Sequence, residues 1–399
     1  MSKISKDTPF ILKTETPENG LFTYQKNGFF FALVAEGLEE EGGRELAELG
    51  AEEVKAVYRG VRFKADMPTV YRINYQSRLC TRILAPLLTF DCHSTKYLYK
   101  TARNIPWPAI LRKNGSFAVS ATVSHSKIRH SKYAALCLKD AVVDSFREEF
   151  GVRPDVDRRE PDLWLHLHVE NNRAVISLDT SGGSLHRRGY RQDSVEAPMQ
   201  ETLAAAIVRF SGWNGEKPLY DPMCGSGTIL AEAYMRYCRI PAACFRDRFG
   251  FAAMPDFSPS DWKAEKEKAD KARRKLPAGL ISGSDGSQES VAAARENLAT
   301  LPGGREVVIK KSIFQKLVNL ENRVIISNPP YGIRLGREEE NASLMKEFGD
   351  FLKHRCQGSE AYLYFGRREM LKTIGLKPAW KKDLSNGGLK GVLARYDMY

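Results

Sequence analysis

The chain has 399 residues, 42% of them hydrophobic and 10% aromatic, a composition typical of globular domains with buried cores. No apolar run approaches the roughly 18 residues that a membrane helix needs, and the N-terminus lacks a signal-peptide core. We therefore expect a cytoplasmic protein, with a monomer favoured and no membrane partner. The seven cysteines and seven histidines follow no disulfide or metal-site spacing, so we also expect no metal.

Positive charge is concentrated in one part of the sequence. The formal net charge is +12, which indicates an acidic polymer as partner. Residues 92–139 contain no Asp or Glu but nine Lys or Arg, with five aromatic residues between them. Cations neutralise phosphates and aromatic rings stack on bases, so this segment favours nucleic acid over a membrane surface. The alternative is a solvated face whose aromatic residues belong to the core.

The first half of the chain predicts two α+β segments. Residues 1–28 are polar and predict an extension or a short added hairpin. Residues 29–90 predict strand, helix, a hairpin turned at Gly60, helix and strand, the order of a ferredoxin-like unit. Residues 71–182 overlap the end of this unit and continue with helices and strands. These strands alternate apolar and polar residues, so one face of their sheet is expected to stay solvated.

The second half, residues 190–399, alternates predicted strands and helices. This alternation predicts an α/β domain with a mostly parallel, doubly wound sheet. The run DWKAEKEKADKARRK, residues 261–275, carries many charges of both signs. It predicts a solvated helix rather than a binding element.

A glycine-rich turn stands at residues 219–233, LYDPMCGSGTILAEA, between a predicted strand and a helix. Gly225 and Gly227 allow a ligand to approach the backbone closely, and the helix N-terminus offers free N–H groups. The turn is not a P-loop, because no Lys-Ser/Thr follows, and it lacks the third glycine of a dinucleotide fingerprint. Asp221, at the strand end, is placed to accept a hydrogen bond from a cationic amino group.

Asp285 ends the next predicted strand, where doubly wound folds hold an acid on ribose hydroxyls. Its separation from the glycine loop exceeds the roughly 20 residues expected of a dinucleotide fold. An insertion, residues 236–261, and the charged helix occupy this gap. The alternative role for Asp285 is an N-cap of the following helix.

The motif SNPPYG, residues 327–332, follows the apolar run RVIIS and ends another predicted strand of the same sheet. Asn328 cannot act as a general base, but its amide oxygen accepts hydrogen bonds. Together with the Pro329 carbonyl, it would favour a pyramidal exocyclic amine with an available lone pair. Pro329 and Pro330 would hold these carbonyls rigidly, and Tyr331 would stack on the base. The alternative is a rigid turn with Tyr331 in the core.

Several stretches resemble known families. DPMCGSGTILAEA is similar to the cofactor loop of class I S-adenosylmethionine-dependent methyltransferases, and SNPPYG to the motif of members that act on exocyclic amines. HSKIRHSKYAALCLKDAVVD resembles part of a THUMP RNA-binding domain. AVISLDTSGGSLHRRGYRQDSVEAPMQETLAAAIVRFSGW resembles the N-terminal half of fused bacterial enzymes that methylate guanine N2 in large-subunit ribosomal RNA. The likeness runs from about residue 29 to the C-terminus.

The resemblance implies a class I, Rossmann-like domain over residues 190–399, with S-adenosylmethionine as cofactor and guanine N2 in 23S ribosomal RNA as target. The implied catalytic residues are Asn328, Pro329, Pro330 and Tyr331. The implied cofactor-binding residues are Gln200, Glu201, Thr202, Asp221, Pro222, Cys224, Gly225, Ser226, Gly227, Thr228, Asp285, Ser312 and Ile313. The expected RNA-binding residues are Lys96, Lys100, Lys127, Arg129, His130, Lys132, Arg187, Arg188 and Arg191.

The sequence departs from this family in two places. KKSIFQKL stands where the family has an acid near the adenine, so Ser312 and Ile313 are expected to supply backbone contacts instead. The chain ends at Tyr399 without the second methyltransferase half, so a separate chain performs that second modification or none does. Three alternatives stay open: methylation of adenine N6, a transfer RNA target, and a non-catalytic RNA-binding or ribosome-assembly factor.

Overall fold

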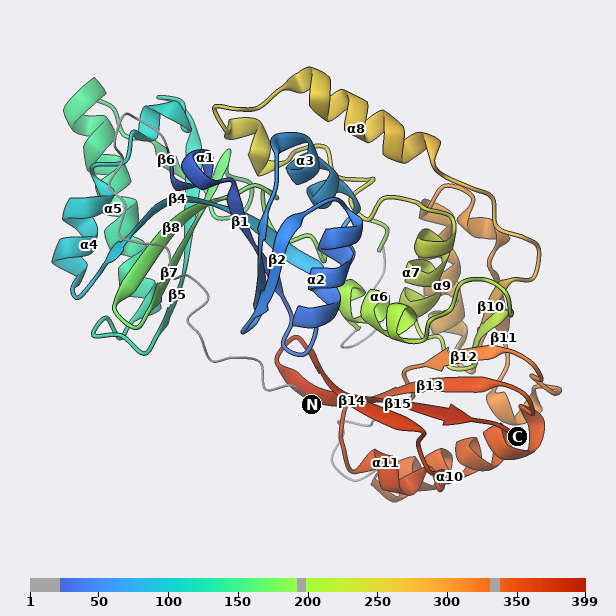
Figure 1. The fold of residues 1–399 in the computed structure, drawn as a ribbon. Coiled ribbons are helices and arrows are strands. Elements are labelled where there is room, and N and C mark those ends of the chain that lie inside the picture. The colour runs from blue at the N-terminus through green and yellow to red at the C-terminus, as the bar shows by residue number, and fades with distance from the viewer. Residues whose placement is uncertain (1–21, 192–198, 331–337) are drawn as a thin grey trace. The chain divides into compact units, whose positions relative to one another are not determined.

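The computed structural model describes residues 22–191, 199–330 and 338–399, with side chains from residue 342 onward in the last range (Figure 1). The chain divides into two compact units. The first contains the residues up to Val34, Glu39–Leu185 and Arg246–Glu267. The second contains Ala35–Leu38, His186–Phe245 and Lys268–Tyr399. Within the described residues, no helix combines the length and the hydropathy of a membrane span.

The first unit is built on an eight-stranded sheet, in the order β2-β3-β1-β4-β8-β7-β5-β6. Its first half contains, in chain order, β1 (Phe29–Val34), α2 (Glu39–Glu48), β2 (Glu52–Val57), β3 (Gly60–Lys64), α3 (Met67–Gln76) and β4 (Cys80–Asp91). This order confirms the predicted ferredoxin-like unit. The described part of the N-terminal segment is a short helix, α1 (Thr23–Asn27), so the predicted added hairpin is wrong for these residues. Residues 1–21 lie outside the described residues.

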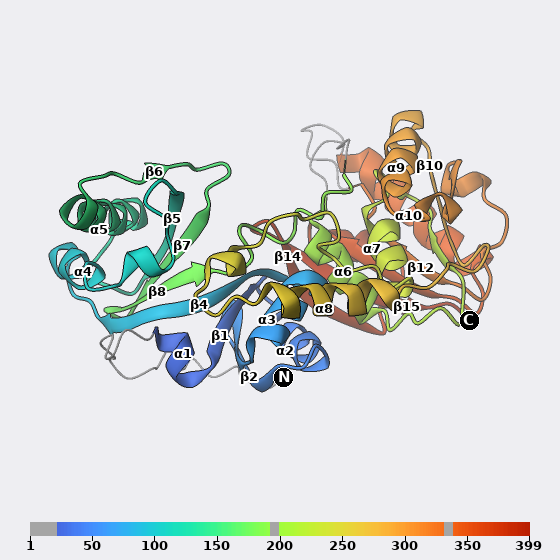
Figure 2. The same cartoon turned by 90° about the horizontal axis from the view of Figure 1, so that it is seen from above.

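The second half of this sheet belongs to the basic segment. It contains α4 (Thr95–Ala102), η1 (Trp107–Ala109), β5 (Ser116–Ser124), α5 (Ser131–Phe150), β6 (Asp155–Val156), β7 (Leu163–Glu170) and β8 (Arg173–Asp179). Helices α4 and α5 lie side by side (Figure 2), joined by a hydrogen bond from Tyr99 to Asp144. Strand β8 pairs with β4, so both segments share one continuous sheet.

The inserted segment of the second half folds onto the first unit. It contains η2 (Gly250–Ala253) and most of α8 (Pro259–Lys271). Trp262 packs edge-on against Tyr71 and Tyr75 of α3. The Glu265 carboxylate accepts two hydrogen bonds from the Arg72 guanidinium, at 2.8 and 2.7 Å. The prediction of a merely solvated helix is therefore wrong for this face of α8, because its aromatic residue and one acid are anchored.

The second unit contains a seven-stranded sheet, in the order β11-β10-β9-β12-β13-β15-β14. Its parallel strands are β9 (Leu219–Asp221), β10 (Ile281–Asp285), β11 (Val308–Lys311), β12 (Val324–Ser327) and β13 (Glu360–Phe365). Helices α6 (Glu201–Phe210) and α7 (Thr228–Tyr237) lie on the opposite side of the sheet from α10 (Glu338–Arg355) and α11 (Met370–Thr373) (Figure 1). Helix α9 (Gln288–Thr300) packs beside α7. The predicted mostly parallel α/β sheet is confirmed.

An antiparallel hairpin, which was not predicted from the sequence, completes this sheet. Strands β14 (Trp380–Asn386) and β15 (Leu389–Asp397) pair with each other, and β15 pairs with β13. The turn between them is Gly387-Gly388, with φ of 59° and 99°, conformations that favour glycine. Alternate residues of β15 join α10 in the apolar core, and they include Val392, Ala394 and Tyr396.

Candidate functional site

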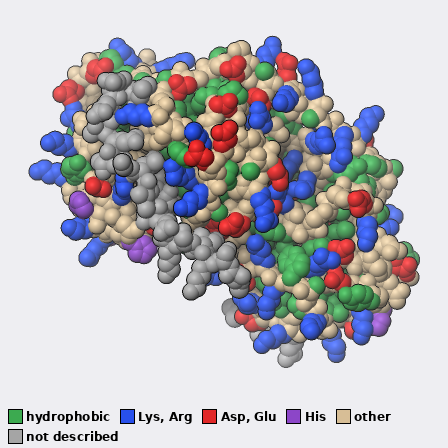
Figure 3. Space-filling model, in the orientation of Figure 1, with side chains coloured by type: hydrophobic (Ala, Val, Ile, Leu, Met, Phe, Trp, Pro, Cys, Tyr) green, Lys and Arg blue, Asp and Glu red, His purple; other side chains and the backbone are tan. Residues whose placement is uncertain are grey.

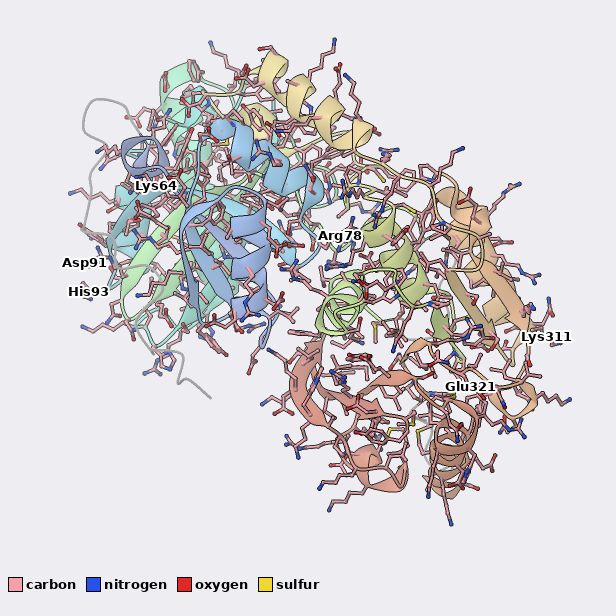
Figure 4. All side chains as sticks on the ribbon, turned by 45° about the vertical axis from the view of Figure 1, so that its right-hand side comes forward. Lys64, Arg78, Asp91, His93, Lys311 and Glu321 are labelled. Carbon is pink, nitrogen blue, oxygen red and sulfur yellow. The ribbon has the colours of Figure 1, made fainter. Side chains whose placement is uncertain are left out.

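The candidate site lies at the carboxyl edge of three neighbouring strands of the second unit. Strand β9 is flanked by β10 on one side and by β12 on the other, with Gly283 opposite Asp221 and Ile325 opposite Tyr220. The chain runs outward from β9 to β10 and β11, and then returns to β12 on the other side. This reversal of direction is the topological switch point, where open α/β sheets bind ligands. In Figure 4, Lys311 marks the end of the outermost strand, β11, at this edge.

The glycine loop after β9 is fixed by hydrogen bonds from neighbouring elements. The Cys224 N–H donates to the Ser284 carbonyl at 3.0 Å, and Asn297 of α9 donates to the Ser226 carbonyl at 3.1 Å. Gly227 adopts φ of 79°, and a Cβ there would lie 3.1 Å from the Ala294 Cβ. Glycine is therefore required both for the backbone conformation and for the close approach to α9.

Asp221 lies at the base of this loop and is almost fully buried. Its Oδ1 accepts hydrogen bonds from the Ser327 hydroxyl at 2.7 Å and from the Met223 N–H at 3.1 Å. Burial outweighs these hydrogen bonds and raises the pKa of Asp221 to about 7. A cation placed beside this carboxyl would favour its charged form, so the site is suited to a ligand that carries an amino group.

Asp285, at the end of β10, is shared between the loop and the following helix. One carboxylate oxygen accepts a hydrogen bond from the Gly225 N–H, and the other accepts one from the Ser287 N–H, both at 2.9 Å. The N-cap of α9 is Ser287, whose hydroxyl accepts from Ser290, so Asp285 itself is not the cap. Its position joins the glycine loop to the neighbouring strand end.

Asn328 directly follows β12 and supplies an unused hydrogen-bond acceptor. Its Oδ1 atom is buried, yet no donor within the described ranges reaches it. A buried acceptor without a donor costs about 1–3 kcal/mol, so such an atom points to a ligand that supplies the missing hydrogen. Tyr331, predicted to stack on the base, lies outside the described residues.

A hollow of about 410 Å³ connects these strand ends. Of the residues predicted from sequence, it brings together Pro222, Gly225, Asp285, Ile313, Asn328 and Pro330. The remaining lining residues were not predicted: Met223, Gly286, Ser290, Phe314, Gln315 and Leu344. Position after a strand end could have indicated Phe314 and Gln315, whereas no sequence signal marks Leu344 of α10. The Ile313 side chain leans over Gly286, where an added Cβ would lie only 2.9 Å from it.

The other predicted cofactor residues do not line the described wall of the hollow. They are Gln200, Glu201, Thr202, Asp221, Cys224, Ser226, Gly227, Thr228 and Ser312. Gln200 precedes α6, and its N–H donates to Asn386 of the C-terminal hairpin at 3.1 Å. Burial raises the pKa of Glu201, whose Oε1 lies 3.5 Å from Arg191.

Two of the arginines predicted to bind RNA have structural partners in the second unit. The Arg188 side chain is buried and pairs with the buried carboxylate of Glu232 at 3.3 Å. A fully buried guanidinium has no surface to offer a phosphate, so the prediction for Arg188 is corrected. Arg191 is half-buried and donates to the Thr228 hydroxyl and the Met199 carbonyl, both at 3.0 Å. Arg187, the residue before Arg188, is exposed.

The predicted RNA-binding residues of the basic segment are all exposed. They lie on α4 and around the N-terminus of α5, and they are Lys96, Lys100, Lys127, Arg129, His130 and Lys132. Two aromatic side chains stand among them, Tyr97 at 49% and Tyr133 at 60% exposure, so these rings are not core residues. Lys, Arg and His side chains project from the left margin of Figure 3, where Figure 1 places α4.

Residues 188–395 match the family described as the RMKL-like methyltransferase domain. The chain belongs to this family. Residues 92–179 match the THUMP domain and residues 29–84 match the RlmL ferredoxin-like domain, so the predicted resemblance is confirmed. The basic α+β segment is therefore a THUMP domain, and RNA is the substrate class of this methyltransferase.

Relatives with known names agree with this assignment. The chain is 37% identical over 371 residues to a putative RNA methyltransferase of Synechocystis, covering 93% of this chain and 97% of that protein. It is also 37% identical to the ribosomal RNA large subunit methyltransferase K/L of Syntrophotalea carbinolica and 36% identical to that of Photobacterium profundum. Both alignments include 92% of this chain. They cover only 53% and 52% of the two relatives, so the chain spans about half of their length.

Solved structures extend the likeness to the cofactor. The structure of SMU.472, described as a putative methyltransferase complexed with SAH, has a TM-score of 0.82 and 28% identity. That likeness covers 94% of this chain and 98% of that one. A possible methylase from Clostridium difficile has a TM-score of 0.83, 26% identity and the same coverage. The cofactor of this methyltransferase is therefore S-adenosylmethionine.

The residues present fit this cofactor. The apolar side chains of Ile313 and Phe314 suit its adenine. Asp221 does not line the hollow, but its carboxyl at the base of the glycine loop would attract a cationic amino group. Asn328, whose oxygen has no donor among the described residues, lines the same hollow. A ligand there would therefore bring its reacting end close to an acceptor that still lacks a hydrogen.

Cofactor binding should depend on the ionisation of Asp221. The amino group of S-adenosylhomocysteine stays cationic between pH 6 and pH 8, so its binding favours the charged carboxylate. Below pH 7 the protein must first release the Asp221 proton, which weakens binding. We expect the Kd measured by calorimetry to fall about tenfold as the pH rises from about 6 to 8. Asp221→Asn should flatten this profile, and an equally steep profile in that variant would contradict the role.

Proposed function

We propose that the chain transfers a methyl group from S-adenosylmethionine to the exocyclic N2 of a guanosine in 23S ribosomal RNA, in the cytoplasm. The observation that carries the chemistry is the buried amide oxygen of Asn328, a residue of the hollow wall, which no donor among the described residues reaches. The choice of target is supported by the relatives named as ribosomal RNA large subunit methyltransferases K/L, at 35–37% identity. Because the chain spans about half of those proteins, their target comes to this chain as a proposal.

Asn328 orients the amine without changing its own ionisation. Its oxygen accepts one N–H of the guanine amino group, and the carbonyl of Pro329 accepts the other. An amine held in this way becomes pyramidal, and its lone pair is released from conjugation with the ring. The two prolines restrict the backbone that carries these acceptors, so the geometry is set before the base arrives.

The cofactor, when bound, would supply an electrophilic methyl carbon in exchange for its sulfonium bond. Asn328 and the Pro329 carbonyl would hold N2 with its lone pair directed toward that carbon. One amine proton then passes to water, because Asn328 cannot take it. A paired guanine must leave its helix to reach such a pocket, at a cost of a few kcal/mol, so an unpaired target is favoured.

Methylation of adenine N6 is the second candidate. A solved structure with a TM-score of 0.82 and 25% identity is titled a predicted N6-adenine-specific DNA methylase from Listeria monocytogenes. The Asn328 oxygen would orient either amine, so the site itself does not separate the two bases. The named RNA relatives and the THUMP domain favour guanine in RNA. A non-catalytic role is disfavoured, because a relict pocket would not need to keep a buried acceptor that the described part of the chain leaves unsatisfied.

The identity of the product nucleoside tests the target directly. The protein is incubated with labelled S-adenosylmethionine and unmodified 23S ribosomal RNA, and the RNA is digested to nucleosides. We expect the label in N2-methylguanosine. Label in N6-methyladenosine would transfer the activity to the second candidate. Transfer RNA is offered in a parallel incubation. Label in transfer RNA but not in 23S RNA would assign transfer RNA as the substrate instead.

The exposed cations at the α5 N-terminus should set the salt dependence of RNA binding. Each phosphate contact contributes about 0.7–0.9 to the slope of log affinity against log salt. Replacing Lys127, Arg129 and Lys132 together by Ala should weaken binding of ribosomal RNA and lower that slope by about 2–3. A matched loss of three charges on α8, at Lys263, Lys268 and Lys271, is the control. Equal slopes in both variants, measured by filter binding, would place the RNA surface elsewhere.

A further inference from the structure

The inserted segment forms a second hollow inside the first unit. It lies between Arg246–Glu267 and the loop that connects η1 to β5, and its volume is about 640 Å³. Every residue that lines it belongs to the first unit, so it is separate from the cofactor hollow. Its volume lies within the range of sites for small molecules and single nucleotides. No part of methyl transfer uses this hollow.

The wall supplied by the insertion is rigidly built. The Arg246 guanidinium donates to the carbonyls of Ser181, Gly182 and Ser184 at 2.7–3.2 Å, so it fastens the start of the insertion to the chain after β8. A Cβ on Gly250 would lie 1.9 Å from the Asp179 carbonyl oxygen, so the two backbones are in direct contact. The insertion therefore forms a fixed wall rather than a loose loop.

Aromatic side chains form one wall of the hollow. Phe249, Phe251, Phe257 and Trp262 line it from the insertion, and their rings pack against one another at centroid distances of 4.9–5.8 Å. Ile110 and Leu111 line it from the η1–β5 loop. Phe249 and Phe251 are buried, whereas Phe257 and Trp262 are half-buried and leave ring surface for a planar group such as a nucleobase. Such a group gains about 1–3 kcal/mol from each stacking contact.

The rim carries polar side chains that the fold does not use. Arg112, Asn114 and Asp247 line the hollow, are exposed, and form no hydrogen bond or ion pair within the described ranges. Asp162, in contrast, accepts from Ser116 and pairs with Arg248 at 2.7 Å, which fixes the opposite side. A free cation suits a phosphate, whereas a free amide and a free carboxylate suit the hydrogen-bonding edge of a base or a ribose hydroxyl.

We propose that this second hollow binds one unpaired nucleotide of the substrate RNA, with its base on the aromatic interior and its phosphate at Arg112. Arg112 and Asn114 belong to the acid-free segment of the THUMP domain, residues 92–139, which makes a nucleic acid the complementary partner. A duplex cannot insert a base into a hollow of this size without unpairing it, so single strands are preferred. The proposal rests on RNA binding but not on which amine is methylated.

Filling the hollow tests the proposal. Ala252 lines it and is exposed, so Ala252→Leu reduces its volume without entering the core. Ala264→Leu, on the exposed face of α8 and outside the hollow, is the matched control. The probes are a fluorescein-labelled RNA of about 12 nucleotides, long enough for a strand-binding site, and the same RNA annealed to its complement. Thermal melting verifies that each variant is folded.

We expect Ala252→Leu to raise the Kd for the single strand at least about fivefold, the effect of one lost stacking contact, and to leave the duplex Kd unchanged. Ala264→Leu should bind both probes as the unaltered chain does. Unchanged single-strand binding by folded Ala252→Leu would overturn the proposal. Equal weakening of single strand and duplex would also overturn it, because the hollow would then not select an unpaired nucleotide.

A second pair of variants tests the phosphate contact independently of volume. Arg112→Gln should weaken single-strand binding, whereas Arg159→Gln, an equal charge loss at an exposed position outside the hollow, should not. Identical effects of the two changes would count against a specific contact. These measurements need neither cofactor nor methyl transfer, so a failure of the guanine assignment appears in the nucleoside analysis and not here.

Discussion

The proposed methyl transfer depends on one interaction, the hydrogen bond that the buried amide oxygen of Asn328 can accept from a target amine. An acceptor left without a donor costs about 1–3 kcal/mol, which is a large fraction of the stability of a domain. Asn328 follows β12 and lines the cofactor hollow. An incoming amine can therefore supply the missing hydrogen there. No donor among the described residues satisfies this oxygen, so a target amine that donates to it would recover that energy, which favours the bound and reacting state.

The rest of the site makes this arrangement possible. Three parallel strands end at one edge, so Asp221, Asp285 and Asn328 come close together although they are far apart in the sequence. The Ser327 hydroxyl donates to Asp221 and thereby joins the target-amine motif to the base of the glycine loop. Burial keeps the pKa of Asp221 near 7, so the charge of this carboxyl responds to a cationic ligand. The proposed cofactor and target sites are therefore linked by this hydrogen bond.

Much of this site could be predicted from sequence because it depends on local rules. Strand ends, glycine turns and a proline-flanked amide are visible in short stretches, and the carboxyl ends of parallel strands meet at one edge. The β-α-β-β-α-β order of the first unit is likewise a matter of local pattern and turn chemistry, and the structure has that order. Gly225, in the loop after β9, and Asp285, at the end of β10, are joined by a direct hydrogen bond.

What the sequence did not indicate depends on contacts between distant residues. Arg188 reads as a surface cation in LHRRGYRQ, and only the fold brings Glu232 to it and buries both. Leu344 reaches the cofactor hollow because α10 packs across the sheet, and no local pattern records that crossing. The charged run of α8 contains one tryptophan, Trp262, whose packing could not be predicted because its partners, Tyr71 and Tyr75, lie nearly 200 residues earlier. The second hollow exists only because Arg246–Glu267, although they interrupt the sequence of the second unit, pack within the first unit.

The most direct test of the central claim separates chemistry from binding in Asn328→Ala. Single-turnover methyl transfer to unmodified 23S ribosomal RNA and the Kd for S-adenosylhomocysteine are measured on the same preparation. Asn319→Ala, an exposed asparagine before β12, is the control. The account predicts loss of transfer by at least about a hundredfold, as for removal of a comparable transition-state hydrogen bond, with the Kd unchanged. Transfer at the rate of the control would contradict it.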